Sequence, residues 1–351
     1  MIAQFDVNTI WCRKFGQALR RRYPDTLLFS PRSFFESEAP TPEQGVISVA
    51  LPRSWWNWTA FVSMPLLAHR ARALAATRGG TIDTAIFTSF NFLPLARKLG
   101  GQARIIYYCF DDYRSYAAFA GWGREGVIAW ESGLCRLASL SVFVSAALRD
   151  RAVAEYGLDP AACVVVPNAS EPRFTAETLR PHELADLPGP IFGTVGVFND
   201  RIDFGFLDRL ANSAEVGSLA LVGPMQDCPD TDGAIARLRD NPKVHWFGAR
   251  PHDEIHTWMA GIDIAVIPYA RTQLNYFCSP MRLWDHLAIG QPIIATDACD
   301  QLAWRDGVFV VASGDSLDQS ITRAKSAAAG GRRPHLESWD DRVALLAPWI
   351  S

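Results

Sequence analysis

The chain has 351 residues, of which 49% are hydrophobic and 20% are charged, so it can form cores for about two ordinary domains and is not a disordered chain. The formal net charge of -3 gives no support to a nucleic-acid binder that acts through bulk charge. Seven scattered cysteines without a C-x-x-C pair indicate a reducing, cytoplasmic setting rather than a disulfide framework.

Export and membrane insertion are not indicated by the sequence. The first residues, MIAQFDVNTIWCRKFG, lack the apolar block and the cleavage site of a signal peptide. Apolar runs are all too short to span a bilayer.

Short β-branched runs, turns and amphipathic helices alternate along the whole chain. In the first half, the pattern predicts strands at 26–30, 45–51, 84–89, 104–110, 140–145 and 163–168. The helices predicted between them lie at 11–22, 59–77, 92–99, 125–137 and 146–156. In the second half, the predicted strands lie at 190–198, 218–223, 243–248, 263–269, 292–296 and 308–312. The helices of that half are predicted at 203–213, 232–240, 252–260, 280–289 and 315–328. This alternation predicts parallel sheets that are covered on both faces.

A domain boundary is predicted within 167–190, which is rich in Pro, Ala, Glu and Arg and has no steady period. We therefore predict an α/β protein with two Rossmann-like, doubly wound domains, 1–172 and 173–335, that face each other across a cleft. Residues 336–351 are predicted to form a helix that packs back on the first domain. Ligands of such sheets bind at the carboxyl ends of the strands, so the cleft is the predicted active site.

One helix of the second half has an arginine in its first turn. Ser279 is a good N-cap residue, Pro280 suits the first helical position, and Gly290 is a typical terminator. Arg282 opposes the helix dipole, which is unfavourable unless an anion binds there. With Asp285 one turn away, the motif suits a nucleoside diphosphate whose ribose hydroxyls bind the carboxylate. A solvated Arg282–Asp285 ion pair is an equally good explanation.

The segment SPMRLWDHLAIGQPIIAT (279–296) resembles the S-P-x-K-x-x-E-x-x-A-x-G-x-P-V-I-A-T segment of GT-B glycosyltransferases, especially family 4 members that build bacterial polysaccharides. Other segments match that family in the same order from about residue 104 onward. They are IIYYCFDDYRSY (105–116) and LSVFVSAALRDR (140–151), which resemble teichuronic-acid-type transferases, then VPNASEPRF (166–174), VGVFNDRIDFGFLDRLA (195–211) and GIDIAVIPYA (261–270).

The resemblance implies a cytoplasmic glycosyltransferase, transferring a hexosyl or glycuronosyl group from a UDP- or GDP-linked sugar. The acceptor would be a saccharide or a lipid-linked saccharide in the assembly of a bacterial surface polysaccharide or exopolysaccharide. A helix N-terminus with Arg282 would stabilise the departing diphosphate, so no metal and no other cofactor are expected. The D-T-D at 230–232 matches the D-x-D motif of metal-dependent glycosyltransferases but falls in a predicted surface loop.

By position, the resemblance assigns Ser279, Met281 and Arg282 to the donor diphosphate and Asp285 to the ribose. Arg201 is either another phosphate contact or an ordinary loop arginine. The remaining candidates, for the base and sugar pocket, are Phe247, Gly248, Arg250 and Tyr269.

The sequence departs from the family pattern at Phe277, where retaining members carry the first of two glutamates. Arg282 and Asp285 stand in place of Lys and Glu. The tetrapeptide SPMR also resembles the S-x-M-K of the xanthan-pathway glucuronosyltransferase, an inverting GT-B enzyme. The donor sugar and the stereochemistry therefore stay open.

Two adjacent carboxylates, Asp111 and Asp112, follow a strongly apolar predicted strand in the first half. An aspartate at this end of a strand faces the predicted cleft, where it can act as general base on an acceptor hydroxyl in an inverting transfer. The resemblance favours Asp111 for that role. Asp112 fits a turn or helix-cap role better.

A membrane contact is predicted for 52–74, where Trp55, Trp56 and Trp58 precede an apolar stretch and several cations. Such a helix can lie at the interface of an anionic membrane. A core helix behind an aromatic acceptor loop is the alternative.

Two other functions are compatible with the same sequence. One is a sugar-nucleotide epimerase of related fold, which would act on a single donor without an acceptor. The other is a non-catalytic, nucleotide-sugar-binding partner of another transferase, which the absence of the first glutamate leaves open.

Overall fold

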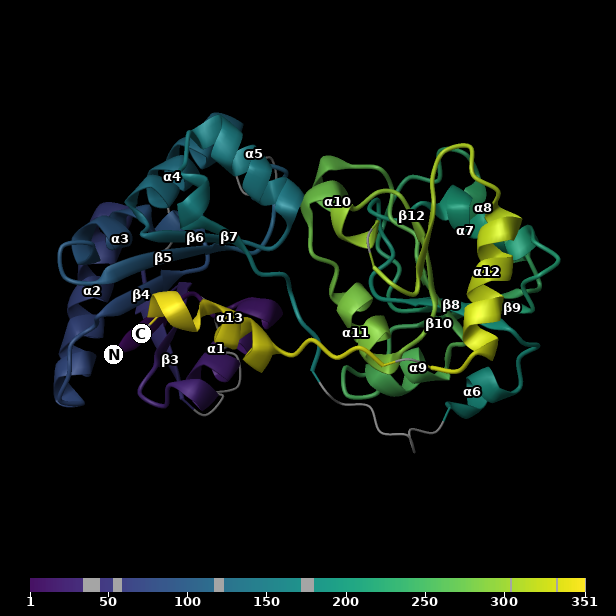
Figure 1. The fold of residues 1–351 in the computed structure, drawn as a ribbon, viewed down its shortest axis with the longest axis horizontal. Helices are drawn as coiled ribbons and strands as arrows, with labels where there is room; N and C mark the ends of the chain where they lie inside the picture. The colour runs from purple at the N-terminus through teal and green to yellow at the C-terminus, as the bar shows by residue number, and fades with distance from the viewer. Residues whose placement is uncertain are drawn as a thin grey trace. The chain divides into compact units, whose positions relative to one another are not determined.

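A computed structural model of the protein (Figure 1) describes residues 1–33, 45–52, 59–116, 123–171, 180–303, 305–332 and 334–350. The chain divides into two compact units. Unit 1 contains Met1–Asn168 and Trp339–Ser351, and unit 2 contains Ala169–Ser338. The division thus falls four residues before the boundary that we predict at 172/173, and the C-terminal helix belongs to unit 1.

Unit 1 is built around a parallel sheet of seven strands in the order β3-β2-β1-β4-β5-β6-β7. The strands are β1 (Ile2–Phe5), β2 (Leu27–Ser33), β3 (Val46–Leu51), β4 (Thr84–Phe87), β5 (Arg104–Cys109), β6 (Leu140–Phe143) and β7 (Cys163–Val165). The helices are α1 (Ile10–Arg22), α2 (Ala60–Thr77), α3 (Leu93–Leu99), α4 (Arg124–Leu137), α5 (Ala146–Tyr156) and α13 (Trp339–Ile350). Strand order reverses between β1 and β4, the position at which doubly wound sheets bind ligands.

Strand β1 is not predicted from the sequence, although it lies inside the sheet between β2 and β4. It has only four residues, and the fully buried Gln4 interrupts its apolar pattern. The Gln4 side chain is accommodated because its Nε2 donates to the carbonyl oxygen of Cys12 at 2.8 Å. A polar residue that pairs with a helix backbone cannot be recognised as a core residue from periodicity alone.

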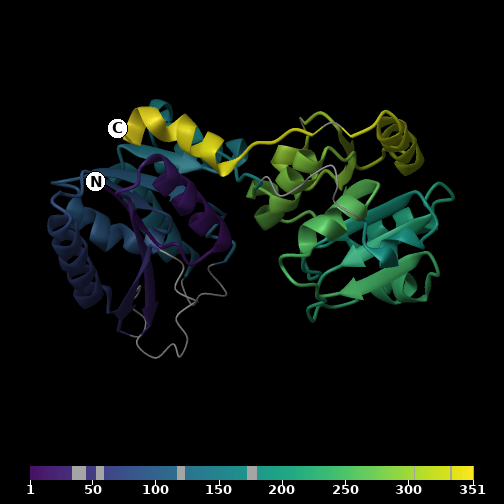
Figure 2. The ribbon, with the colours of Figure 1, turned by 90° about the horizontal axis from the view of Figure 1, so that it is seen from below.

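The C-terminal helix α13 packs beside α1, as Figures 1 and 2 both show. Arg21 of α1 forms an ion pair with Asp340 of α13 at 2.9 Å. The buried Arg342 donates from Nε to the carbonyl oxygen of Asn168 at 3.2 Å. The last helix of the chain is thus bonded to Asn168, the residue after which the chain passes from unit 1 into unit 2.

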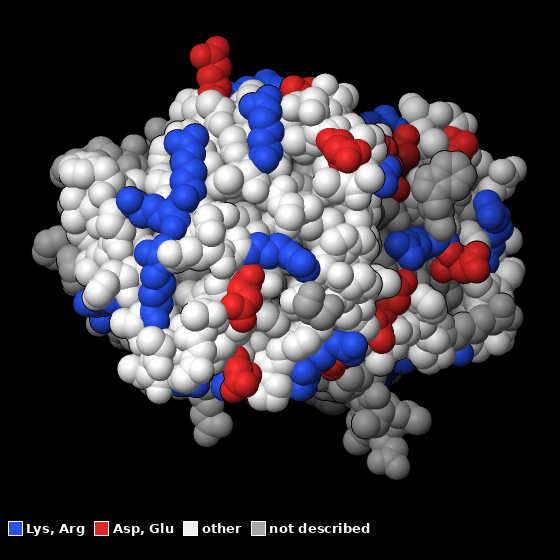
Figure 3. Space-filling view, turned by 60° about the vertical axis from the view of Figure 1, so that its left-hand side comes forward, with Lys and Arg blue, Asp and Glu red and all other residues white. Residues whose placement is uncertain are grey.

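The solvent-facing side of α2 has an unusual composition. Phe61 and Val62 are 73% and 49% exposed, and neither α2 nor α3 contains an acidic residue. The Arg72 guanidinium donates to the carbonyl oxygen of Lys98 at 2.7 Å, which places the two helices side by side. Figure 3 turns this side of unit 1 forward and shows Lys and Arg side chains in a row beside uncharged surface. No described helix is both long and apolar enough to cross a membrane.

Unit 2 has a parallel sheet of six strands in the order β10-β9-β8-β11-β12-β13. The strands are β8 (Ile191–Val195), β9 (Ser218–Val222), β10 (Val244–Gly248), β11 (Ile264–Ile267), β12 (Ile293–Thr296) and β13 (Val308–Val311). The helices are α6 (His182–Ala185), α7 (Phe204–Asn212), α8 (Ala234–Asp240), α9 (Ile255–Gly261), α10 (Gln273–Phe277), α11 (Met281–Ile289) and α12 (Leu317–Ala329). The short helices α6 and α10 are not predicted from the sequence. The order again reverses once, between β8 and β11.

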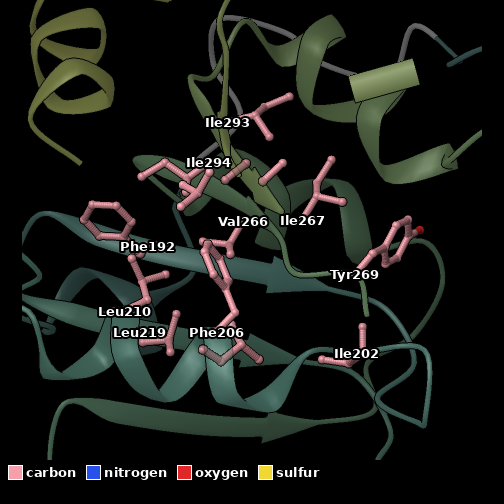
Figure 4. Packing of buried hydrophobic residues seen from close by; sticks show 14 of the residues in the cluster. Phe192, Ile202, Phe206, Leu210, Leu219, Val266, Ile267, Tyr269, Ile293 and Ile294 are labelled. Carbon is pink, nitrogen blue, oxygen red and sulfur yellow. The ribbon is translucent and has the colours of Figure 1, made fainter. Parts of the chain in front are cut away.

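The larger core of unit 2 lies on one face of β8 and β9 and also includes consecutive residues of β11 and β12 (Figure 4). Phe192 and Leu219 point into it, and Phe206 and Leu210 of α7 cover it. Tyr269 lies at the rim of the cluster, with its hydroxyl group directed away from the other labelled side chains. A second cluster on the opposite face contains the alternate strand residues, such as Ile191 and Val195. The predicted parallel, doubly wound architecture is confirmed in both units, and all seven cysteines are free.

Helix α11 begins one residue later than we predict, and Ser279 is not its N-cap. Pro280 occupies that position and makes no side-chain capping bond. The Ser279 hydroxyl instead accepts a hydrogen bond from Nε1 of the buried Trp284 at 3.0 Å. An indole N–H on the next turn of the helix competes for the hydroxyl, which explains the difference. At the other end, Gly290 has the predicted left-handed conformation, with φ of 81°.

The carboxyl end of α11 is anchored by a buried polar pair. Nδ1 of His286 lies 2.7 Å from Oε1 of Gln291. Nε2 of Gln291 donates to the carbonyl oxygens of Met259 and Ile262, where α9 ends. Burial lowers the pKa of His286 to about 4, because a charged ring would be stripped of water there. The neutral ring therefore belongs to the folded state.

This pair makes stability depend on pH. Between the folded pKa of about 4 and the ordinary value of 6.5, the unfolded chain binds a proton that the folded chain does not. We expect His286 to lower the free energy of unfolding by about 1.5 kcal/mol as the pH falls from about 6.5 to about 5. Urea unfolding at both pH values, for wild type and His286→Gln, measures this term. Removing the exposed His252 as His252→Gln is the control, and an equal pH dependence in all three proteins would contradict the expectation.

Candidate functional site

Arg282 extends from the first turn of α11 to the carboxyl end of β8. Its Nη1 donates to Oγ1 of Thr194 at 3.2 Å, and the guanidinium lies 5.4 Å from the ring centroid of Tyr269. Within the described part of the chain, this guanidinium forms no ion pair with a carboxylate. The predicted solvated pair with Asp285 is therefore not what positions Arg282.

Arg201, in the loop after β8, reaches the same tyrosine. Its guanidinium lies 5.7 Å from the Tyr269 ring centroid, and its Nε donates to Oδ1 of Asn275 at 2.8 Å. Arg201 and Arg282, called the arginine pair below, therefore meet at one ring where β8 and β11 diverge. Two cations so placed favour an anion with several oxygens, such as a phosphate.

Asn275 is a residue of this site that sequence reasoning misses. It is fully buried in α10, and its Nδ2 donates to the carbonyl oxygens of Arg201 at 2.9 Å and Ala270 at 2.8 Å. Its Oδ1 accepts from the Arg201 side chain. One amide thus joins α10 to the loops after β8 and β11 and holds one of the two cations. Its partners are distant in sequence, so no local pattern could reveal them.

Tyr269 is only 7% exposed, and burial raises its pKa to about 12, with the two nearby arginines opposing that rise. The phenol is therefore neutral at ordinary pH and offers a hydroxyl group and an aromatic face rather than a charge. Its ring faces both members of the arginine pair, which gives each a cation–π contact.

Glycines with positive φ stand at the carboxyl ends of three neighbouring strands. Gly196 and Gly223 directly follow β8 and β9, and Gly248 is the last residue of β10. We call these three residues the glycine ledge. The Gly196 amide donates to Val222, and the Gly223 amide donates to the carbonyl oxygen of Gly248 at 2.8 Å. A Cβ atom on Gly196 would lie 2.2 Å from Nη2 of Arg282, and one on Gly223 would lie 1.9 Å from the Gly196 oxygen. Side chains are thus excluded beside Arg282, where a ligand can approach the backbone. Of these three glycines, only Gly248 is predicted from the sequence to belong to the site.

Asp285, predicted to bind ribose, accepts a hydrogen bond from the buried hydroxyl of Ser170 at 2.8 Å. Ser170 also forms a parallel bridge with Ser338, so the segments at the two ends of unit 2 run together beside α11. One carboxylate oxygen of Asp285 therefore holds this segment. Met281 is the first residue of α11, where the backbone amides have no acceptor within the helix.

Phe247 and Arg250 contact α9 rather than the arginine pair. The Phe247 ring lies 4.8 Å from that of Trp258, within the cluster on the opposite face from Tyr269. The Arg250 guanidinium lies 4.4 Å from the Trp258 ring and 3.7 Å from the Glu183 carboxylate. The structure therefore brings together Arg201, Tyr269 and Arg282 from the predicted set and leaves these two apart from them.

In unit 1, the structure separates the two adjacent aspartates. Asp112 is 1% exposed, accepts from Ser115, and forms an ion pair with Arg151 of α5 at 2.5 Å, which is a structural role. Asp111 is half-buried and accepts from its neighbour's amide at 2.9 Å and from the hydroxyl of Tyr116 at 3.0 Å. Both Asp111 oxygens are thus already hydrogen-bond acceptors. Among the described residues, no group of three or more His, Cys, Asp or Glu side chains is placed to hold a metal ion.

Comparison with known proteins places these features in context. No model of a known protein family matches the sequence. The chain is 28% identical over 109 residues to TuaH of Bacillus subtilis (strain 168), a protein assigned to teichuronic acid biosynthesis as a glycosyltransferase. That match spans 31% of this chain and 27% of the relative, so it covers only about a quarter of TuaH.

Solved structures resemble the chain over nearly its whole length. Sucrose-phosphate synthase from Thermosynechococcus elongatus is 17% identical, with a TM-score of 0.64 over 98% of this chain and 94% of that one. The lipopolysaccharide outer core galactosyltransferase WaaB is 13% identical, with a TM-score of 0.64 over the same shares. The chain therefore has the GT-B fold, as the sequence resemblance implies.

Asn275 gives a prediction about stability. Asn275→Ala leaves two buried carbonyl oxygens and one guanidinium N–H without their partner, which should lower the free energy of unfolding by about 2 to 4 kcal/mol. Asn275→Asp should be similarly damaging, because a carboxylate would face the same two carbonyl oxygens. Denaturant unfolding measures both, with Asn212→Ala on the exposed end of α7 as the matched control. A change below about 1 kcal/mol for Asn275→Ala would mean that this amide is not the link described.

Proposed function

We propose that the protein is a glycosyltransferase that transfers a sugar from a nucleoside diphosphate sugar to a saccharide or lipid-linked saccharide. The transferase would act in the assembly of a bacterial surface polysaccharide or exopolysaccharide. The observation that carries the proposal is the arginine pair at Tyr269, at the position where the strand order of unit 2 reverses. Doubly wound sheets bind nucleotides at that position.

In this reaction, the site would stabilise the negative charge that develops on the departing diphosphate. The arginine pair and the first amides of α11 supply positive charge and donors at one place. The glycine ledge supplies backbone without side chains beside them. These groups need no metal for that task, and we propose that the transfer is metal-independent. The names of TuaH and WaaB, which refer to teichuronic acid and lipopolysaccharide, support a polysaccharide acceptor.

Nucleotide binding tests the donor site directly. We expect UDP, GDP or dTDP to raise the melting temperature of the wild type through preferential binding to the folded state. Arg282→Ala should weaken binding of that nucleotide by roughly 10- to 100-fold, because a charge-assisted contact is lost. Gly196→Ala should act in the same direction, since its methyl group would occupy the place of Nη2 of Arg282. Isothermal titration measures both, with the exposed Arg239→Ala in α8 as the control.

Release of free nucleoside diphosphate from a panel of UDP-, GDP- and dTDP-sugars separates the transferase from the two alternatives. An epimerase changes the sugar but releases no diphosphate, and a non-catalytic binding partner does neither. If no nucleotide raises the melting temperature and no donor is cleaved, the proposed function is wrong.

We also propose that unit 1 contacts an anionic membrane through the solvent-facing side of α2. Phe61 and Val62 are exposed there, and helical geometry places Arg70 and Arg72 at the two edges of that side. Arg97 and Lys98 of α3 add exposed positive charge next to Arg72. Exposed apolar groups between cations suit a surface of anionic lipid. The three tryptophans of the predicted membrane segment lie outside the described residues.

Vesicle sedimentation tests this contact. The protein should sediment with vesicles of phosphatidylcholine and phosphatidylglycerol but not with phosphatidylcholine alone, and binding should weaken as salt rises. A double variant, Phe61→Ser with Val62→Ser, should lose most of the binding, and Arg70→Glu should lose part of it. Leu345→Ser removes an exposed leucine from α13 and is the control. Equal sedimentation of all variants would refute the contact through α2.

A further inference from the structure

We propose that Ser170 is a positioning residue, which fixes the Asp285 carboxylate and so makes the donor site select ribonucleotides over 2′-deoxyribonucleotides. The inference rests on the proposed function and names the class of nucleotide that the donor carries. Both residues belong to unit 2. Asp285 lies on α11, one turn after Arg282, whose guanidinium reaches the carboxyl end of β8.

The carboxylate of Asp285 suits a pair of neighbouring hydroxyl groups. An ionised carboxylate only accepts hydrogen bonds, and its two oxygens together have about four acceptor positions. A ribose offers two adjacent O–H donors, at C2′ and C3′, whereas a 2′-deoxyribose offers only the one at C3′. Asp285 is half-buried, so a bound nucleotide that lacks one of these donors leaves the carboxylate incompletely solvated. Affinity for the deoxy form is lowered as a result.

The hydroxyl group of Ser170 determines how this carboxylate is oriented. Ser170 is 0% exposed, and its Oγ donates to Oδ1 of Asp285 at 2.8 Å. A short acidic side chain on the surface of a helix would otherwise sample several rotamers. The bond from Ser170 restricts the carboxyl group to one orientation, and the lone pairs that this bond does not use face in a defined direction.

The backbone of Ser170 is itself held by the last segment of unit 2. The Ser170 amide donates to the carbonyl oxygen of Glu337 at 3.0 Å. Ser170 and Ser338 also form a parallel bridge. The position of the hydroxyl group is therefore set by pairing between the two segments at the ends of unit 2.

This last segment is in turn bonded to α11. The His335 amide donates to the carbonyl oxygen of Leu287 at 2.9 Å. The Glu337 carboxylate accepts from Nη1 of Arg305 at 3.3 Å, and the Arg305 guanidinium lies 4.7 Å from the ring centroid of Trp284. Both contacts end on residues of α11, the helix that carries the carboxylate.

Ser170 is thus placed relative to Asp285 by bonds that do not involve its own hydroxyl group. A donor held in this way orders the carboxylate before the nucleotide binds, so binding does not have to immobilise that side chain. Removal of the hydroxyl group adds this ordering to the binding step, although no contact between protein and nucleotide is lost. A purely structural role would affect stability alone. Selectivity between two nucleotides therefore distinguishes positioning from a structural role.

The wild-type protein gives the first test, with nucleotides that differ by one oxygen atom. Isothermal titration with UDP and 2′-deoxy-UDP, or with GDP and 2′-deoxy-GDP if guanine binds better, measures the ribose selectivity as the ratio of the two affinities. We expect the ribonucleotide to bind roughly 10- to 100-fold more tightly, because the deoxy form lacks one hydrogen bond to a charged group. Equal affinities would overturn the inference without recourse to any variant.

Ser170→Ala gives the second test. It should lower the ribose selectivity by roughly 3- to 10-fold, mainly through weaker binding of the ribonucleotide. Ser170→Cys keeps the size of the side chain but is a weak donor, and it should lower the selectivity in the same direction. Ser218→Ala is the matched control, because Ser218 is also 0% exposed and donates to the carbonyl oxygen of Pro188 at 2.8 Å. Melting temperature should fall in both alanine variants, and selectivity only in Ser170→Ala.

Two further variants assign the effect to the ribose. Arg282→Ala should weaken both nucleotides by the same factor and leave their ratio unchanged, because the arginine acts on the diphosphate. Asp285→Ala should abolish the selectivity, and the addition of Ser170→Ala to it should change the ratio no further. A further fall in the double variant would show that Ser170 does not act through Asp285.

If Ser170→Ala keeps the wild-type selectivity, or if Ser218→Ala lowers it equally, Ser170 is a structural link and not a positioning residue. Either result would leave the proposed function intact, provided that the wild type binds a nucleotide and cleaves its sugar derivative. A wild type that binds none of the nucleotides and cleaves no donor would instead reject the proposed function, and this inference with it.

Discussion

The arrangement of unit 2 depends on two guanidinium groups sharing the ring of one buried tyrosine. Like charges brought together in a half-buried place repel each other, and burial removes part of the water that would screen them. Neutral groups contribute to the arrangement: the hydroxyl of Thr194 contacts Arg282, the amide of Asn275 contacts Arg201, and the aromatic face of Tyr269 contacts both. Among the described residues, the Arg282 guanidinium forms no ion pair with a carboxylate.

Unit 1 also has a charged side chain at its own reversal of strand order. Asp6 directly follows β1 there, and Oγ1 of Thr88 donates to the carbonyl oxygens of Asp6 and Phe5. In the loop after β5 of the same unit, the Asp112 carboxylate forms an ion pair with Arg151, which makes Asp112 a fixed part of that loop.

Sequence reasoning predicts the parts of this structure that depend on local pattern. Alternating strands and helices predict both sheets, and Arg282 is identified because it opposes its own helix dipole. The misses are residues whose partners are distant. Gln4 and Asn275 satisfy backbone groups of other elements, and the hydroxyl of Ser279 is taken by the Trp284 indole. The conformation of Asp6 is missed because a positive φ in a non-glycine residue leaves no mark on the sequence.

The asparagine in α10 has a consequence for finding similar chains. Its two N–H groups face two carbonyl oxygens while its own oxygen faces a guanidinium, and among side chains of that size only an amide satisfies all three. A search that requires two glutamates around this helix passes over the chain, which carries Phe277 and Asp285 at those positions. This chain instead carries a glycine at the carboxyl end of each of three successive strands and an asparagine seven residues before Arg282.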